Sequence, residues 1–301
     1  MAIDMRDQTF GVEIETVGMR REQACRLVAA MFGTDDTVHY DGTCYDTWSC
    51  KDKDGRKWKF MRDGSLNTVN GVGSGCEIVT PVLKYKDLDM LQQVARLVRL
   101  VGAKADGSCG IHVHVGADKH TPQSMTNLMK MFIGKEDTIY KGLQISDRRI
   151  QQYTRKVNRT LAQRLADGEK PRTYEEWKHL WYESQGGSVH DANYHYDDTR
   201  YHGLNYHATF NKGVTVEFRL FNGSLHAGKI KAYVQFCLAL SAKAINSRTV
   251  SMDKVDSVDE KHMYGCWLLR LGLVGDEFKT CREHIMAGLE DGAAASGRRA
   301  A

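Results

Sequence analysis

Three short apolar segments of this sequence each carry two polar side chains that are separated by one residue. The pairs are Glu13 and Glu15 in "FGVEIE", His112 and His114 in "GIHVHVG", and Glu217 and Arg219 in "VTVEFRLF". Successive side chains of a β-strand point to opposite faces, so the two members of each pair share one face of a sheet. If the three strands are neighbours with aligned registers, one face gathers carboxylates, imidazoles and a guanidinium. Such a face cannot be a dry core, because each unpaired buried charge would cost several kcal/mol.

A cluster of carboxylates and imidazoles suits a divalent metal ion. Oxygen ligands favour Mg²⁺ or Mn²⁺, whereas sites built from histidine alone favour Zn²⁺ or iron. Glutamates outnumber histidines in this set, and Arg219 beside Glu217 would suit a phosphate that the metal holds. The combination indicates nucleoside triphosphate chemistry. Taken singly, each pair also fits a solvated strand face, or an ion pair within one strand for Glu217 and Arg219.

Other segments do not match known nucleotide or calcium signatures. The sequence has no G-x-x-x-x-G-K-[ST] motif, and "GVGSG", residues 71–75, leads into a strand and is interpreted as a turn. "KDKDG", residues 51–55, lacks the remaining ligands of a calcium loop. The basic residues near it suit either a solvated hairpin or, together with Trp48 and Trp58, a surface that grips a polyanion. They are Lys51, Lys53, Arg56, Lys57 and Lys59.

Strands and helices alternate around these segments. A helix is expected at 20–33 with Gly33 as its cap, a hairpin around the Asp54-Gly55 turn, a strand in "GCEIVTPVL" and an amphipathic helix in "KDLDMLQQVARLVRLVG". Residues from about 121 to 184 are expected to be mostly helical, as are 226–248 and 259–290. "GLNYHATF" and "GVTVEFRLFNGS" are expected to form two paired strands. Because hairpins dominate the strand connections, the pattern favours an α+β fold with an antiparallel sheet.

The length and composition fit an ordinary globular protein. We expect one catalytic domain over residues 1–290, with a helical block near 121–190 as a possible insertion, and a disordered tail at 291–301. A net charge of +4 among 301 residues does not demand a nucleic-acid partner. No apolar run is long enough for a membrane span, and the eight cysteines form no C-x-x-C pair. The expectation is a cytoplasmic protein with reduced thiols and no membrane partner.

An ordered series of motifs resembles the amidoligase family. It comprises "FGVEIE", "DGS" at 63–65, "GCEIVTP" at 75–81, "GIHVHVG", "RYHGLN" at 200–205 and "TVEFRLFNGSL", and it spans roughly residues 9–240. That family looks like a divergent branch of the glutamine synthetase and glutamate–cysteine ligase superfamily. The resemblance implies a site on one face of a curved antiparallel sheet with helices on one face. It also implies ATP and Mg²⁺ or Mn²⁺ as cofactors, and small-molecule or peptide carboxylates and amines as substrates, joined through an acyl phosphate.

The resemblance also implies roles for individual residues. Arg219 matches the arginine that contacts the transferring phosphate, and His114 matches a histidine near the phosphates or the acyl substrate. Arg200 lies where the relatives place substrate and phosphate arginines. Asp63 is a substrate residue or part of an Asp-Gly turn. The residues that match metal ligands are Glu13, Glu15, Glu77, His112 and Glu217.

No general base for the amine is evident, and the candidates are His202, Tyr206 and His207. Two other functions stay open. A cupin-like oxygenase or isomerase would use "HVH" with Asp118, but it leaves the glutamate pairs without a role. A non-catalytic module would bind anions through the basic hairpin.

Overall fold

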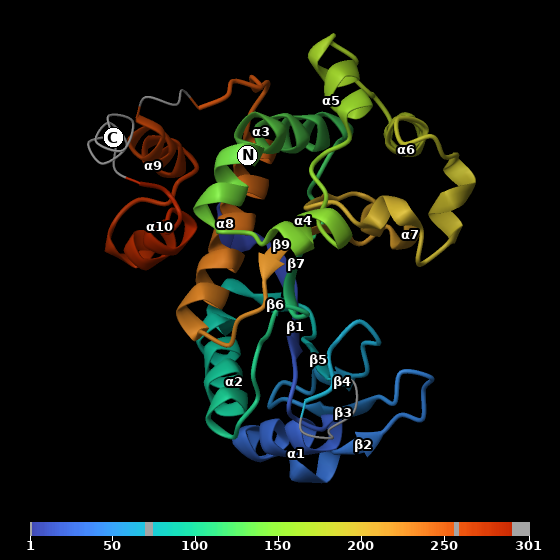
Figure 1. Cartoon of the computed structure of the whole chain (residues 1–301), viewed down its shortest axis with the longest axis vertical. Coiled ribbons are helices and arrows are strands. Elements are labelled where there is room, and N and C mark those ends of the chain that lie inside the picture. The colour runs from blue at the N-terminus through green and yellow to red at the C-terminus, as the bar shows by residue number, and fades with distance from the viewer. Residues whose placement is uncertain (1, 70–74, 256–258, 291–301) are drawn as a thin grey trace, which may run out of the picture. The chain divides into compact units, whose positions relative to one another are not determined.

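The chain forms two compact units, described here by a computed structural model that covers residues 2–69, 75–255 and 259–290 (Figure 1). The strand-rich unit contains residues 9–114 and 221–231, and the helix-rich unit contains residues 1–8, 115–220 and 232–301. The fold is α+β, as predicted, and the strand pairs with a described register are antiparallel. The single domain over 1–290 and the insertion near 121–190 stay predictions. The tail at 291–301 lies outside the described residues.

A sheet organises the strand-rich unit, with the strand order β2-β3-β4-β5-β1-β7 and with β6 paired to β1. Strand β2 forms one edge, and the β3–β4 hairpin, which contains the predicted Asp54-Gly55 turn, lies between β2 and β5. The strands are β1 (Thr9–Thr16), β2 (His39–Tyr40), β3 (Trp48–Lys51), β4 (Lys57–Met61), β5 (Cys76–Val79), β6 (Leu83–Lys84) and β7 (Gly110–Gly116).

One face of this sheet is apolar and is covered by helix α1 (Arg21–Phe32). Ile14, Ile78 and Phe60 are register partners across β1, β5 and β4, and all three are fully buried. Helix α1 packs on β3 and β4, where the rings of Phe32 and Trp58 lie 5.4 Å apart. The helix ends at Gly33, whose φ of 71° lies in the left-handed region that glycine adopts at low cost, as predicted. Helix α2 (Leu88–Leu100) packs against α1.

Helices dominate the helix-rich unit, in agreement with the predicted helical ranges. Thr121 caps the first long helix by accepting the Ser124 N–H, and Pro122 occupies its first turn. Within the described ranges, no helix is long and apolar enough to cross a membrane. The helices are α3 (Pro122–Gly142), α4 (Asp147–Gln152), α5 (Arg159–Ala166), α6 (Tyr174–Glu183), α7 (His207–Lys212), α8 (Ala227–Asn246), α9 (Glu260–Arg270) and α10 (Lys279–Ile285). Residues 227–231 of α8 belong to the strand-rich unit.

The predicted strand "GLNYHATF" is wrong over most of its length. Only β8 (Leu204–Asn205) is extended, and it pairs with β9 (Thr215–Asn222). The chain then turns into α7, because the Asn205 Oδ1 accepts the His207 N–H at 2.7 Å. Tyr206, within the predicted strand, is a core side chain whose ring contacts the rings of Trp177 and Trp181.

Candidate metal centre

The acidic residues of β1 and β5 lie on the sheet face opposite the apolar row. Glu15 is the register partner of Glu77, and Glu77 is in turn the partner of Met61 on β4. Glu13 lies two residues before Glu15 and therefore shares its face. The strand-rich unit thus presents a line of carboxylates on one face, while the core residues Ile14 and Ile78 point to the other.

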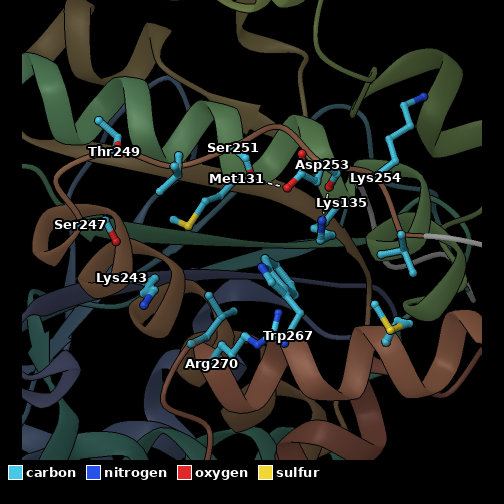
Figure 2. Close-up of a pocket in the computed structure, with 14 residues that line it drawn as sticks. Met131, Lys135, Lys243, Ser247, Thr249, Ser251, Asp253, Lys254, Trp267 and Arg270 are labelled. Atoms are coloured by element: carbon cyan, nitrogen blue, oxygen red, sulfur yellow. Dashed lines mark hydrogen bonds between the residues drawn. The ribbon is translucent and has the colours of Figure 1, made fainter.

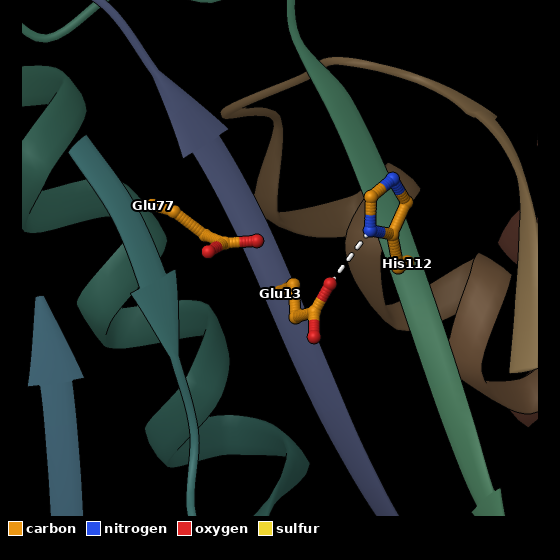
Figure 3. A group of neighbouring side chains, drawn as sticks. All are labelled: Glu13, Glu77 and His112. Atoms are coloured by element: carbon orange, nitrogen blue, oxygen red, sulfur yellow. Dashed lines mark hydrogen bonds and ion pairs between the residues drawn. The ribbon is translucent and has the colours of Figure 1, made fainter. Parts of the chain in front are cut away.

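Strand β7 brings two histidines beside these carboxylates. Figure 3 shows Glu13 on β1 between Glu77 on β5 and His112 on β7. The His112 Nδ1 lies 2.7 Å from the Glu13 Oε2, and the His112 Nε2 lies 3.6 Å from the Glu15 Oε1. The His114 Nε2 lies 3.2 Å from the other Glu13 oxygen. The two histidines therefore flank Glu13 from one neighbouring strand.

These contacts keep Glu13 ionised. Burial acts to raise the pKa of its carboxyl group, but the charge of His114 and the hydrogen bonds from His112 and His114 outweigh burial. The net result is a pKa well below the usual glutamate value. Glu13 is therefore a carboxylate at neutral pH, which is the form that binds a cation.

Glu15 is the most buried of the acidic residues on this face. Only 3% of its surface is exposed, and one of its carboxylate oxygens accepts the backbone N–H of Gly110 at the start of β7. A charge-assisted bond of this kind fixes the carboxylate in one orientation. His112, at 2% exposure, is buried to the same degree. A buried glutamate and histidine on a strand interior point to a site rather than to a solvated sheet face.

Two overlapping groups in this unit could each hold a metal ion. The first contains Glu13, Glu77 and His112, and the second contains Glu15, Asp63 and Glu77. In each group the potential ligand atoms lie within 4.8 Å of one another, and Glu77 belongs to both. Because a shared carboxylate can bridge two ions, the arrangement is suited to a pair of cations.

The sequence motifs did not identify Asp63 as a ligand candidate, because it lies in a turn and outside the strand alternation. The structure shows the turn as well: the Asp63 Oδ1 accepts the N–H and the hydroxyl of Ser65, each at 2.8 Å. Asp63 lies two residues after Met61, the last residue of β4, and Met61 is paired with Glu77; this register brings Asp63 to the group and could not be read from the sequence.

Glu217 and Arg219 form a buried ion pair in the helix-rich unit. The Arg219 Nη1 lies 2.9 Å from the Glu217 Oε1, and the Asn205 Nδ2 donates to the Glu217 Oε2 at 2.7 Å. The guanidinium also lies over the Tyr201 ring, 5.6 Å from its centre. These contacts fix the plane of the guanidinium, which is the requirement for directional phosphate binding. Asn205 and Tyr201 were not singled out from the sequence.

Arg200 lies in a segment rich in aromatic residues. Its guanidinium is 5.3 Å from the Tyr196 ring centre and 5.7 Å from that of Tyr201, and its Nη1 donates to the carbonyl of His195 at 3.3 Å. Arg200 and Arg219 therefore both contact Tyr201. The shared tyrosine places the two arginines in one neighbourhood of the helix-rich unit.

The three candidates for a general base differ in their surroundings. The His202 Nδ1 lies 2.9 Å from the Lys156 carbonyl and its Nε2 lies 2.7 Å from the Gln185 Oε1, while burial lowers its pKa to about 4. Tyr206 donates to the carbonyl of Met125, and burial raises its pKa well above the usual value. Both are thus held in structural roles.

His207, the third candidate, is also a buried side chain. Its Nδ1 lies 2.7 Å from the Tyr182 hydroxyl, whereas its Nε2 is buried and has no hydrogen-bond partner among the described residues. Burial lowers its pKa, so the ring is neutral at pH 7. The neutral ring has one N–H, so Nε2 can accept a proton only in the tautomer in which Nδ1 donates to the Tyr182 hydroxyl.

Part of the positive charge of the basic hairpin is neutralised by ion pairs. Arg56 forms ion pairs with Asp52 and Asp87 at 2.8 and 2.7 Å, and Lys57 pairs with Asp41 at 2.8 Å. These contacts weaken the interpretation of the hairpin as a polyanion-binding surface. The "GVGSG" turn falls mostly outside the described residues.

A comparison with protein families matches residues 6–241 to the family described as "Putative amidoligase enzyme". The chain belongs to this family. The amidoligase match includes every residue of the candidate centre, from Glu13 to His114, and also Arg200, Glu217 and Arg219. No curated protein matches the chain in a sequence comparison.

Proposed function

We propose that this amidoligase family member is an ATP-dependent ligase that joins a carboxylate to an amine through an acyl phosphate. The observation that carries the proposal is the pair of overlapping groups on one sheet face, with Glu77 common to both. A face of this kind suits phosphoryl transfer, in which bound cations neutralise negative charge on the phosphates. Under this proposal the sheet has the same fold as the catalytic sheets of glutamine synthetase and glutamate–cysteine ligase.

The residues on the sheet face fit Mg²⁺ or Mn²⁺ better than Zn²⁺. Four carboxylates and one imidazole form the two groups, no cysteine belongs to either, and hard oxygen ligands favour these ions. Glu13, Glu77 and His112 would hold one ion, and Glu15, Asp63 and Glu77 a second. When bound, such ions supply charge neutralisation for the phosphates of ATP. Under the same proposal Glu217 keeps the role of metal ligand that the family resemblance implies.

The proposed reaction has two steps. An oxygen of the substrate carboxylate attacks the γ-phosphorus of ATP, ADP leaves, and an acyl phosphate forms. The amine nitrogen then attacks the acyl carbon, inorganic phosphate leaves, and the nitrogen loses a proton as the amide forms. Arg219 would stabilise the charge on the transferring phosphoryl group, since Glu217 and Tyr201 already hold its guanidinium in place. His114 and Arg200 would orient phosphate or substrate.

The test is ATP consumption by the purified full-length chain with a pool of amino acids and amines. We expect phosphate release that requires Mg²⁺ or Mn²⁺ and both an acid and an amine. Glu13→Gln and Glu15→Gln should each reduce the rate by about 100-fold or more, because each removes a ligand charge. Glu22→Gln on α1, whose carboxylate pairs with Arg26 on the same helix, is the matched control and should leave the rate unchanged.

Two results would contradict the proposal. One is a folded chain that neither binds nor cleaves ATP with any divalent ion. The other is a turnover rate that is unchanged in both Glu13→Gln and Glu15→Gln. Circular dichroism on each variant separates loss of a ligand from loss of the fold.

A further inference from the structure

A pocket of about 550 Å³ lies in the helix-rich unit, and none of the candidate site residues named above lines it (Figure 2). It is bordered by α3, the end of α8, the segment 247–255 and α9. Figure 2 shows Lys135 on α3, Lys243 on α8 and Arg270 on α9 around the same hollow as the Trp267 ring. The family resemblance gives no role to any of these residues.

The wall formed by residues 247–255 is attached to α3 at both ends. The Asn127 Nδ2 donates to the Ser247 carbonyl at 2.6 Å, and the Lys135 Nζ donates to the Asp253 carbonyl. Between these contacts the segment passes so close to Gly134 that an added Cβ would lie 2.9 Å from the Met252 carbonyl carbon. The pocket is therefore held open by specific contacts with α3 and is not an accidental gap beside a loose loop.

Positive charge gathers around the pocket without matching negative charge. Its single lining carboxylate, Asp253, accepts a hydrogen bond from the Ser251 hydroxyl at 2.6 Å. Across the described part of the chain, no carboxylate comes within ion-pair distance of Lys135, Lys243 or Arg270. Burial lowers the pKa of Lys135, and the charge of Arg270 lowers it further, against the opposing effect of Asp253. A bound anion would add negative charge where the lining has several cations and one carboxylate.

One wall of the pocket is flat and apolar. The Trp267 indole stacks on Tyr264, with ring centres 5.3 Å apart and an angle of 24° between the planes, and it also contacts Phe236 at 6.3 Å. These neighbours fix the indole in one orientation. Met131 and Met263 extend the apolar lining. A rigid aromatic wall next to unpaired cations suits a ligand with a flat apolar body and an anionic group.

We propose that this pocket binds a small organic anion, with its carboxylate or phosphate group between Lys135, Lys243 and Arg270 and its apolar body against Trp267. The site is separate from the carboxylate face of the strand-rich unit. Its occupancy does not depend on ATP or on a divalent metal ion. The proposal can therefore fail or succeed independently of the ligase activity.

Isothermal titration of the full-length chain in metal-free buffer tests the proposal. Phenyl phosphate and benzoate are the two anionic probes, and benzyl alcohol is the uncharged one. We expect saturable binding of at least one anion, no binding of benzyl alcohol, and about tenfold weaker binding for Arg270→Gln or Lys243→Gln. Arg248→Gln is the matched control, because Arg248 is exposed nearby but does not line the pocket. Arg270→Lys keeps the charge and should bind like the wild type to within a few-fold.

The relative affinities of phenyl phosphate and benzoate identify the anionic group that the pocket prefers. The proposal is overturned if neither anion saturates the protein below about 10 mM. It is equally overturned if Arg248→Gln weakens binding as much as Arg270→Gln, since that result would show attraction to general surface charge. Binding that is unchanged in both Lys243→Gln and Arg270→Gln would place the anion elsewhere on the chain and would also contradict the proposal.

Discussion

Glu15 and Glu77 lie directly opposite each other in the antiparallel β1–β5 pair. Like charges at opposed positions of a sheet destabilise it, and burial of Glu15 strengthens the repulsion. Asp63 adds a third carboxylate to the same group. The sheet therefore accepts an electrostatic cost at this position that a bound divalent cation would remove.

The first prediction concerns stability in the presence of metal. Mg²⁺ or Mn²⁺ at about 100 times its Kd should stabilise the chain by about 2.7 kcal/mol, which raises the Tm by several degrees. Glu15→Gln and Glu77→Gln should lose most of this increase, because each variant removes a ligand charge. Differential scanning calorimetry with and without the ion measures the effect. Glu22→Gln should respond like the wild type, and an equal metal response in all four proteins would disprove the two-group site.

The second prediction concerns the buried pair of Glu217 and Arg219. Arg219→Met should destabilise the chain by about 3 kcal/mol, because it removes the cation that compensates a carboxylate with only 3% exposure. Glu217→Gln combined with Arg219→Met should recover part of this loss, since the double variant leaves no buried charge behind. Urea unfolding of the two single variants and the double variant gives the coupling energy. Additive effects would show that the pair is not coupled.

Much of the strand-rich unit could be predicted from local patterns. Alternation alone places Glu13 and Glu15 on one face, Gly33 marks the end of α1, and Asp54-Gly55 marks the hairpin turn. These features depend on neighbours in the sequence. The register of Glu15 with Glu77 was not predictable, because it depends on how two distant strands align.

Residues 203–210 show where local patterns fail. The sequence pattern predicts a strand paired with the next one, yet a hydrogen bond from the His207 N–H to the Asn205 side chain starts α7, and the Tyr206 ring packs against Trp177 and Trp181. Tertiary packing overrides local preference at this point. Asp63 could not be predicted as a ligand for a similar reason. It joins Glu15 and Glu77 only because β1 and β5 bring these two residues beside the turn that contains it.

The third prediction concerns Gly203, whose backbone is hydrogen-bonded to Arg219 of the Glu217–Arg219 ion pair. Its carbonyl accepts the Arg219 N–H at 2.8 Å, and an added Cβ would lie 2.1 Å from the Tyr140 hydroxyl oxygen. Gly203→Ala should therefore force the β8–β9 pair or Tyr140 to shift, at a cost of about 1–3 kcal/mol. Gly107→Ala is the control, because nothing lies within 4 Å of its added Cβ. Thermal unfolding of both variants measures the difference, and equal midpoints would show that the contact relaxes freely.

The last prediction concerns Glu136, a buried carboxyl group on α3. Burial raises its pKa to about 7, against the hydrogen bond that it accepts from the Val157 N–H at 2.8 Å and the charge of Lys156. A folded-state pKa above the unfolded value means that this group favours folding below about pH 4.5 and that its contribution is lost as the pH rises through about 7.

In Glu136→Gln the side-chain amide oxygen can still accept a hydrogen bond from the Val157 N–H, but the side chain cannot ionise. At about pH 8 the variant should therefore be more stable than the wild type by about 2–3 kcal/mol, and at about pH 4.5 the two should be nearly equal. Urea unfolding at both pH values measures the difference, with the exposed Glu283→Gln as a control that should show no such pH dependence. A stability difference that stays constant between the two pH values would mean that folding does not shift the pKa of Glu136, because only a pKa that differs between the folded and unfolded states makes stability depend on pH. That result would show that the hydrogen bond from Val157 and the charge of Lys156 fully offset the effect of burial.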